Sequence, residues 1–446
     1  MSPPSVDTTT QLARRLGLFD ATMIVMGGII GSGIFINPYV VAQRVHTQFL
    51  ILGVWVFGGL LALIAGFIWA ELAAWRPDVG GQYAYLREAF HPGVAFLYGW
   101  VLLLVIQTGG MAAVAVTFAR YFVEMVHLPL SDSVLAAIVL SILTIINCLG
   151  VRAGSTVQSI LMVLKIVAIA GLVVCGLLLA APNSVAPSSH GLLDRPMSLD
   201  LVTAIGAAMV PVLFAYGGWQ TATFLAGEIK EPEKNLTRGL IYGVIGVVLL
   251  YVTANIVYLR VLGTDGLAGA TAPASEVMRH ALGKTGAAII AAGIAISTAG
   301  FLSQSMLTAP RVYFAMARDG LFFKQVAMVH PRTRAPIVAI ALQGALAIII
   351  AFWGRYEQIL NYVVSMDFIF FGLTACCVFV FRKRSPQSIK TIRTPGHPFT
   401  TVLFIAACWL VVINTIIHYP SNTLIGMAIL VAGVPAYLFW RRSSES

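Results

Sequence analysis

The chain has 446 residues, of which 59% are hydrophobic and only 10% are charged. A soluble globular domain normally carries about a quarter charged residues, so this composition excludes a soluble protein and indicates an integral membrane protein. The formal net charge of +10 would also fit a nucleic-acid-binding protein, but the placement of the basic residues along the chain argues against that interpretation.

Long apolar segments follow one another along the chain, and most of them have the ~20 residues that an α-helix needs to cross ~30 Å of hydrocarbon. They lie near 19–42, 48–74, 92–125, 133–150, 155–181, 200–226, 238–262, 285–316, 336–352, 357–381, 399–417 and 421–440. The sequence therefore predicts an all-α polytopic membrane protein with about twelve transmembrane helices. An even number of spans places both termini on the same side of the membrane.

The basic residues are distributed unevenly between the two sides of these predicted spans. If the N-terminus is cytoplasmic, 20 of the 28 Lys and Arg residues lie at inner loops and ends, and 6 lie in outer loops. This bias follows the positive-inside rule. We therefore expect a multi-pass protein of the cell membrane with both termini cytoplasmic, embedded in the lipid bilayer and without a nucleic-acid partner.

The first predicted span contains a glycine cluster with the sequence GGIIGSG at 27–33. Each interior glycine costs a helix roughly 1 kcal/mol relative to alanine, so a continuous helix is not expected there. Inside a bilayer, an unwound backbone persists only where protein or a wet cavity satisfies its N–H and C=O groups. The sequence therefore predicts a broken helix beside a cavity near mid-membrane, as in many secondary transporters.

The sixth predicted span repeats this feature with the sequence FAYGGWQ at 214–220. Interrupted helices at corresponding places in two halves of a chain are typical of inverted-repeat transporters. We expect two inverted five-helix repeats with broken helices 1 and 6, plus helices 11 and 12. The alternative is that the glycines only permit close helix packing. The predicted division is an N-terminal cytoplasmic tail (1–18), repeat one (19–181), repeat two (182–381, with an outer loop at 182–199), helices 11 and 12 with their preceding cytoplasmic loop (382–440), and a C-terminal cytoplasmic tail (441–446).

Four stretches of the chain carry a family resemblance. They are the glycine cluster through Phe35, Glu71-Leu72 with 77–90, 214–219 with Glu228 and 232–236, and 310–313 with 317–320. Together they resemble the amino acid, polyamine and organocation transporter superfamily, and within it a bacterial relative of the L-type amino acid transporter light chains. The resemblance covers nearly the whole chain. It implies two inverted five-helix repeats and transport of amino acids by alternating access.

The two breaks suit a zwitterionic α-amino acid. Where the first helix restarts, several N–H groups lack intrahelical partners and carry the positive end of a dipole, which suits a carboxylate. The carbonyls at about 26–29 and at 214–216 lie across the gap and can accept from an α-ammonium. The predicted substrate-binding residues are Ile29, Ile30, Gly31, Ser32, Gly33, Phe214, Ala215, Tyr216, Gly217, Gly218, Trp219 and Asp367.

Side chains of the sixth span have more specific expected roles. By resemblance to the family's gating aromatic, Phe214 would cap the site from the outside, although a buried phenylalanine is also ordinary packing. Gly217 and Gly218 would leave room for the substrate side chain, and Trp219 would line its far wall.

Lys165 lies in the middle of the fifth predicted span, where a lysine costs a few kcal/mol and is a functional candidate by default. In sodium-coupled relatives of this fold a cation site lies between spans one, five and eight, and the resemblance implies that the Lys165 ammonium replaces that cation. We expect it to reach carbonyls near Gly28 and the hydroxyls of Ser297 and Thr298, which makes sodium coupling improbable. The alternatives are a structural lysine and a proton carrier with a lowered pKa.

Asp367 is the only acidic residue well inside a predicted span. The related animal transporters tend to carry a neutral polar residue at this place, so the resemblance does not tell which substrate side chain this protein prefers. Asp367 would contact substrate or gate, or it would be a satisfied carboxylate that bridges helices. Contact with a positive side chain would favour an alternative function, proton-coupled uptake of cationic amino acids or polyamines.

Other classes of function find little support. The chain has no G-x-S-x-G elbow, no H-E-x-x-H and no P-loop, so we expect no enzyme, cofactor or metal site. A transporter-like sensor or scaffold would normally need an added soluble domain. The loop at 127–132 lacks the cysteine that bonds a heavy chain in the animal light chains, so no disulfide-linked heavy chain is expected. The favoured function is sodium-independent exchange of neutral L-α-amino acids.

Overall fold

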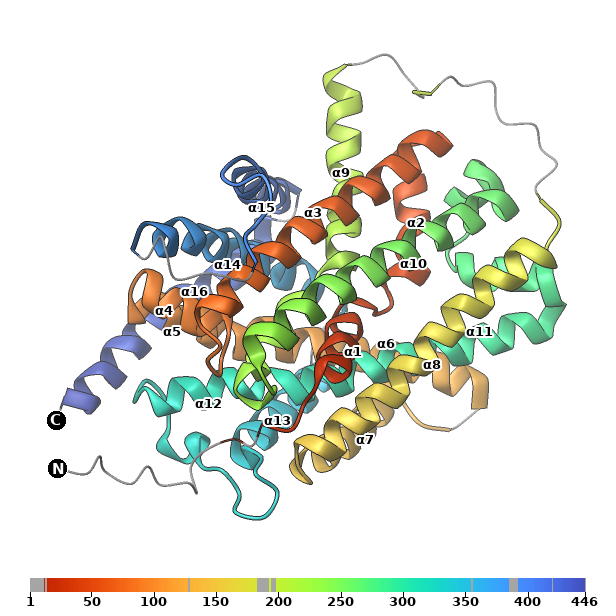
Figure 1. Cartoon of the computed structure of the whole chain (residues 1–446). Coiled ribbons are helices and arrows are strands. Elements are labelled where there is room, and N and C mark those ends of the chain that lie inside the picture. The colour runs from red at the N-terminus through yellow and green to blue at the C-terminus, as the bar shows by residue number, and fades with distance from the viewer. Residues whose placement is uncertain are drawn as a thin grey trace.

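The computed structural model describes residues 12, 14–126, 129–182, 192–193, 198–353, 356–384, 392–418 and 420–445. Within these residues every regular element is a helix (Figure 1), and one isolated β-bridge joins Leu16 to Ile229. The predicted all-α polytopic fold is therefore confirmed. Most of the predicted N-terminal tail (1–11 and 13), most of the outer loop (183–191 and 194–197), residues 127–128 and the terminal Ser446 lie outside the described part of the chain.

The helices keep the labels of Figure 1. The first half contains α1 (Leu18–Ile29), α2 (Gly33–Ala42), α3 (Gln48–Trp75), α4 (Gln82–Ala89), α5 (Pro92–Val101), the π-helix η2 (Leu102–Gln107), α6 (Thr108–Val126), α7 (Asp132–Cys148) and α8 (Val151–Leu178). The second half contains α9 (Leu199–Tyr216), the 3-10 helix η3 (Trp219–Glu228), α10 (Pro232–Gly269), α11 (Pro273–Thr308), α12 (Pro310–Arg318), the 3-10 helix η4 (Lys324–Ala327), α13 (Ile337–Trp353) and α14 (Tyr356–Arg384), followed by α15 (Phe399–His418) and α16 (Pro420–Glu445).

Among the described residues, nine helical segments are long and apolar enough to cross a membrane, and the bent pair α1 and α2 counts as a tenth. With the shorter apolar helices α7 and α13, the number reaches the twelve that the sequence predicts. Gly263 (φ 70°) and Gly283 (φ 64°) interrupt α10 and α11 with a left-handed φ that favours glycine. The seventh span ends and the eighth begins at these kinks, close to the predicted 262 and 285.

The helices pack in a pattern that repeats between the two halves. α1 packs against α10, and its counterpart α9 packs against α3, while α8 packs against α11 and its counterpart α14 packs against α6. The halves meet through α3 with α10, α6 with α11, and α7 with α13. Corresponding helices thus have corresponding neighbours, as two repeats related by a pseudo-two-fold axis would have. This pattern supports the proposed division into repeats at 19–181 and 182–381.

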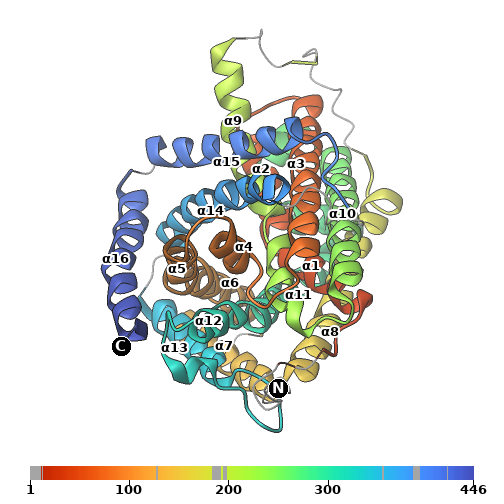
Figure 2. The same ribbon diagram turned by 60° about the vertical axis from the view of Figure 1, so that its left-hand side comes forward.

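The last two helices lie outside this core. α15 packs against α14, and α16 packs against α14 and α5. Figure 2 shows both along the outer edge of the bundle. Trp440 near the end of α16 stacks against Phe322 and Phe96. α16 therefore ends at the same end of the bundle as the start of α5, which we call the terminal end.

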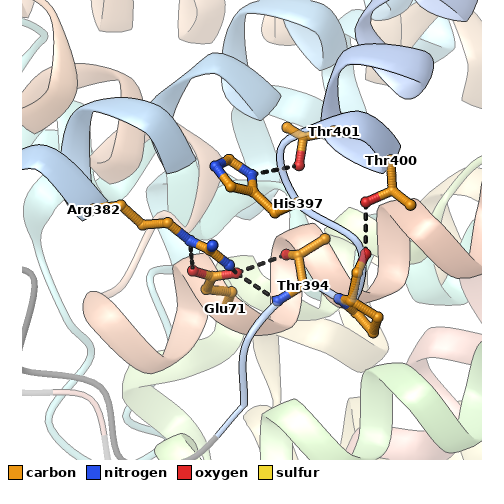
Figure 3. A network of polar contacts seen from close by, with 7 residues as sticks. Glu71, Arg382, Thr394, His397, Thr400 and Thr401 are labelled. Atoms are coloured by element: carbon orange, nitrogen blue, oxygen red, sulfur yellow. Dashed lines mark hydrogen bonds and ion pairs between the residues drawn. The ribbon is translucent and has the colours of Figure 1, made fainter.

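A polar network at the terminal end ties the second and tenth spans to the segment before α15 (Figure 3). The buried Glu71 carboxylate accepts from Nε and a terminal nitrogen of Arg382 (2.7 and 2.9 Å) and from the N–H and hydroxyl of Thr394 (2.7 Å each). His397 shares a hydrogen bond of 2.9 Å with Thr401. Burial, and then the nearby Arg382 guanidinium, hold the pKa of the His397 imidazole below its usual range.

A second ion pair at the terminal end is buried completely. Arg311 Nε donates to Glu228 Oε1 at 2.6 Å, and both side chains are 0% exposed. The carbonyl of Glu228 also accepts from the N–H groups of Arg15 and Leu16 (2.9 and 3.0 Å), which anchors the chain before α1 to the end of η3. Ion pairs of Arg87 with Asp319 and of Arg76 with Glu88 lie at the same end. Charged contacts between helices are therefore concentrated at the terminal end.

Candidate functional site

The first predicted break is present. α1 ends at Ile29, α2 begins at Gly33, and the two helices are bent by 41°. The side chain of Ser32, the N-cap residue of α2, makes no hydrogen bond to the first turn of that helix. Within the described chain, the N–H groups of Ser32, Gly33 and Ile34 form no hydrogen bond to another residue. The start of α2 thus keeps unpaired N–H donors at the positive end of a helix dipole.

The second break is also present, but its second half differs from expectation. α9 ends at Tyr216, Gly217 is extended, and Gly218 adopts φ 111°, which favours glycine. The chain continues as the 3-10 helix η3 and not as an α-helix. The sequence offered no signal for this because both helix types share the same apolar character.

The glycines at the breaks serve two purposes. A Cβ on Gly28 would lie 2.6 Å from the carbonyl oxygen of Gly218, and a Cβ on Gly33 would lie 2.9 Å from the Cβ of Ala215. At these positions glycine also permits the two broken helices to touch. A Cβ on Gly31, by contrast, would meet only Phe301 at 3.8 Å. Gly31 is therefore open to the cavity and not needed for helix packing.

A cavity lies between the two breaks. Ten of the predicted substrate-binding and conformational residues line it, namely Gly28, Ile29, Gly31, Ser32, Gly33, Phe214, Ala215, Gly217, Gly218 and Asp367. Phe301, Phe368 and Phe371 add an aromatic wall from α11 and α14 that sequence reasoning missed. Buried aromatic residues are common in any apolar span, so nothing in the sequence marked these three.

Three of the predicted substrate-binding residues lie outside the lining. Trp219 is 2% exposed and packs against Trp69, Phe371 and Phe404. Trp219 therefore does not form the expected far wall in this structure, because Phe371, which lines the cavity, packs against it. Tyr216 packs against Trp55 and Tyr251. Ile30 contributes its carbonyl to Lys165 and has a fully buried side chain.

The carbonyls at the breaks are partnered by the protein to a larger extent than expected. The hydroxyl of Tyr251 on α10 lies within hydrogen-bond distance of the carbonyls of Ile29 (3.2 Å) and Ala215 (3.4 Å), one in each broken helix. The carbonyl of Phe214 accepts from the N–H of Gly217 at 3.1 Å. A carbonyl has two lone pairs, so these oxygens can still accept from an ammonium. Tyr251 was missed because a tyrosine in an apolar span is usually a packing residue with one satisfied hydroxyl.

Tyr251→Phe is expected to weaken substrate affinity about 2- to 10-fold, because it removes one hydrogen-bonding hydroxyl, worth roughly 0.5–1.5 kcal/mol, from between the two breaks. The measurement is the apparent affinity in proteoliposomes, with Tyr242→Phe, an exposed tyrosine on the same helix, as the matched control. An affinity as unchanged in Tyr251→Phe as in Tyr242→Phe would show that the hydroxyl does not hold the breaks in their binding geometry.

Lys165 on α8 is fully buried, and its ammonium faces the first break. Nζ donates to the carbonyls of Ile30 (2.5 Å) and Gly27 (3.4 Å). Both acceptors lie near Gly28, where the sequence predicted them. Gly300 on α11 makes room for the lysine, since a Cβ there would lie 2.5 Å from Lys165 Cε.

The expected hydroxyl partners of Lys165 on α11 are engaged elsewhere. Ser297 donates to the carbonyl of Gly31 at 3.1 Å. Thr298 donates to carbonyls of its own helix, at Ile294 (3.1 Å) and Ala295 (2.8 Å). Serine and threonine in a span commonly bond back to their own helix, so the sequence alone could not separate the two cases. Ser297 therefore reaches the first break directly, and Thr298 does not.

Taken together, the fold and the cavity define a polytopic membrane protein of the kind that binds a small solute between two broken helices. A family model described as amino acid permease matches residues 16–434. The chain therefore belongs to the amino acid permease family.

Curated relatives agree over nearly the whole length. The serine/threonine exchanger SteT of Bacillus subtilis is 30% identical over 98% of this chain and 98% of its own length. The large neutral amino acids transporter small subunit 2 of Oryctolagus cuniculus is 30% identical over 97% of this chain and 82% of its own length. The human cystine/glutamate transporter is 27% identical over 98% of this chain and 86% of its own length.

Proposed function

We propose that this protein is a sodium-independent secondary transporter of L-α-amino acids, neutral ones first, which exchanges them by alternating access. The observation that carries the proposal is the cavity between the two helix breaks. On one side it meets Ser32 and Gly33, whose unpaired N–H groups suit a carboxylate. Carbonyls of both broken helices lie around it and suit an α-ammonium.

The position of Lys165 supports sodium independence. Its ammonium lies between α8, α1 and α11 and donates to backbone carbonyls of the first break. Backbone carbonyls are the oxygen ligands that a bound sodium ion would use at a broken helix. A fixed positive charge there removes the need for a metal cation and opposes its entry.

The relatives support exchange and neutral substrates. One is named a serine/threonine exchanger and another a large neutral amino acids transporter small subunit. The third is named a cystine/glutamate transporter, which shows that substrates differ among related chains. We propose a small-molecule amino acid as the partner of this chain, without a disulfide-linked heavy chain.

The charge bias supports a cell-membrane protein with both termini cytoplasmic. In that orientation the terminal end is cytoplasmic. The buried Glu228–Arg311 pair then lies on the cytoplasmic side, and the charged contacts there would close the cytoplasmic route from the cavity in this conformation.

Counterflow in proteoliposomes tests the proposal. Vesicles are loaded with one unlabelled amino acid, and uptake of labelled amino acids is followed with sodium and with choline in its place. We expect uptake that requires an internal amino acid and is unchanged in choline. Uptake that collapses in choline would contradict sodium independence, and binding without any uptake would favour a sensor.

A second function is favoured by one observation. Asp367 places a carboxylate in the lining of the cavity, which would suit proton-coupled uptake of cationic amino acids or polyamines. Uptake that requires a pH gradient and is not stimulated by internal amino acid would support this function in place of exchange.

A further inference from the structure

One side of the cavity is formed by helices other than the two broken ones. Gln107 at the end of η2, Gln304 on α11 and Asp367 on α14 line it. α14 packs against η2 and α6, and α6 packs against α11, so these three helices adjoin. An amino acid whose carboxylate meets the start of α2, as the proposed function has it, directs its side chain away from that helix end. The walls left for the side chain include these three residues.

Hydrogen bonding fixes the orientation of the Gln304 amide. Thr221 donates its only hydroxyl hydrogen to the carbonyl of Gly218 at 2.7 Å. Gln304 therefore turns its NH₂ group to Thr221, to which Nε2 donates at 2.5 Å. Its Oε1 is buried and has no partner in the described part of the chain, although Gln304 itself is 0% exposed. A buried acceptor without a donor is costly, so a ligand in the cavity that Gln304 lines would relieve this cost by supplying a donor.

Asp367 adds a charged acceptor to the same wall. No described residue forms a hydrogen bond or an ion pair with its carboxylate, and the described lining contains no Lys, Arg or His. Gln107 also forms no hydrogen bond with a described residue, so its amide can turn either way. Asp367 is half-buried, and removing a carboxylate from water without a partner is unfavourable, so a ligand that supplies a donor would relieve that cost.

A feature of α-helix geometry places Gln107 in the cavity. The π-helix η2 inserts extra backbone into the third span just before α6, and the Thr108 hydroxyl donates to the carbonyl of Leu103 at its end. Single-turn π-helices within α-helices often occur at functional sites, because they turn the following residues to a new face. Gln107 and Gly110 both line the cavity as a result.

We propose that Gln107, Gln304 and Asp367 form a side-chain subsite that recognises a hydrogen-bond-donating side chain, a hydroxyl or an ammonium, and rejects a carboxylate side chain. The inference rests on the proposed function, since it takes the backbone of the amino acid to lie at the two breaks. A hydroxyl gives one donor to the wall, whereas an ammonium gives three and also neutralises Asp367.

The test is competition for counterflow by side chains matched in shape. Threonine carries a hydroxyl where valine carries a methyl group. 2,4-Diaminobutyrate carries an ammonium where glutamate carries a carboxylate, on the same stem. In the wild type, threonine should compete roughly 10- to 100-fold better than valine, because a hydrogen bond to a charged acceptor is lost. Diaminobutyrate should compete and glutamate should not. In Asp367→Asn the threonine preference should shrink and diaminobutyrate should lose most of its affinity.

Glu276→Gln is the matched control, since it also removes one carboxylate but lies in an exposed pair with Arg279. It should keep the wild-type ranking. If threonine competes better than valine but diaminobutyrate does not compete, the subsite takes hydroxyl side chains. If diaminobutyrate competes but threonine is no better than valine, the subsite takes ammonium side chains. Valine equal to threonine together with no competition by diaminobutyrate, glutamate as a good competitor, or an unchanged ranking in Asp367→Asn would overturn the subsite while counterflow itself continues. Absence of counterflow for every amino acid would instead overturn the proposed function.

Discussion

Gly31→Val is expected to weaken amino acid binding by at least roughly 100-fold while the protein still folds and reaches the membrane. Gly31 has room for a side chain, since an added Cβ meets only Phe301 at 3.8 Å. The new side chain would occupy the place where the carboxylate approaches the N–H groups of Ser32 and Gly33. Losing one or two charge-assisted hydrogen bonds, each worth about 1.5–3 kcal/mol, accounts for the size of the effect.

Two other glycine variants make this result specific. Gly53→Val places the same side chain in α3, where an added Cβ meets no atom within 4 Å, and should bind like the wild type. Gly33→Val should lose stability as well as binding, because its Cβ would lie 2.9 Å from Ala215. Binding is measured by competition in proteoliposomes, and folding by thermal unfolding in detergent. If Gly31→Val binds the amino acid as well as the wild type does, the substrate carboxylate does not bind at the start of α2.

Lys165→Ala is expected to slow exchange by one to two orders of magnitude with a smaller effect on binding. The ammonium links α8 to the carbonyls of Gly27 and Ile30 on either side of the first break. Its loss leaves buried acceptors without a charged donor, which costs about 1–3 kcal/mol and shifts a two-state equilibrium between conformations by about the same factor. The turnover rate and the apparent affinity are measured in the same vesicles.

A variant that leaves the lysine in place tests the same role. Gly300→Ala would put a methyl group against Lys165 Cε and displace the ammonium. Gly171→Ala on α8 meets no atom within 4 Å and is the control. We expect Gly300→Ala to resemble Lys165→Ala. Equal turnover and affinity in Lys165→Ala and the wild type would show that the lysine is only packed there, and a rate that no longer responds to external pH would make it a proton carrier.

The spans and their breaks could be predicted because each rests on local sequence. Twenty apolar residues in a row must cross a membrane as a helix, and glycine pairs at 27–28 and 217–218 are unfavourable in a helix. The predicted span ends at 262 and 285 lie close to the kinks at Gly263 and Gly283, because the limits of an apolar segment are also a local feature of the sequence. No local sequence pattern predicted the 3-10 geometry of η3 or the π-helix η2, because both helix types share the apolar character of an α-helical span.

The partners of the site residues were harder to predict than the residues themselves. Lys165 was identified from its cost in a span, but its acceptors Gly27 and Ile30 depend on how α8 meets the bend between α1 and α2. The packing of Trp219 against Trp69, Phe371 and Phe404 likewise depends on distant helices. Tyr251 and Gln304 reach the site from spans with no broken helix, and only the packing of distant segments brings them there.

The central claim is that the two helix breaks hold both charged ends of a free α-amino acid. The most direct measurement compares, in wild-type proteoliposomes, competition by an amino acid that supports counterflow with competition by the same amino acid amidated at its carboxyl group. The amide keeps the side chain and the ammonium but lacks the carboxylate. We predict that the amide competes at least roughly 100-fold more weakly, since it cannot accept charge-assisted bonds from the start of α2. An amide that competes as well as its parent acid would contradict the assignment of these N–H groups to the substrate.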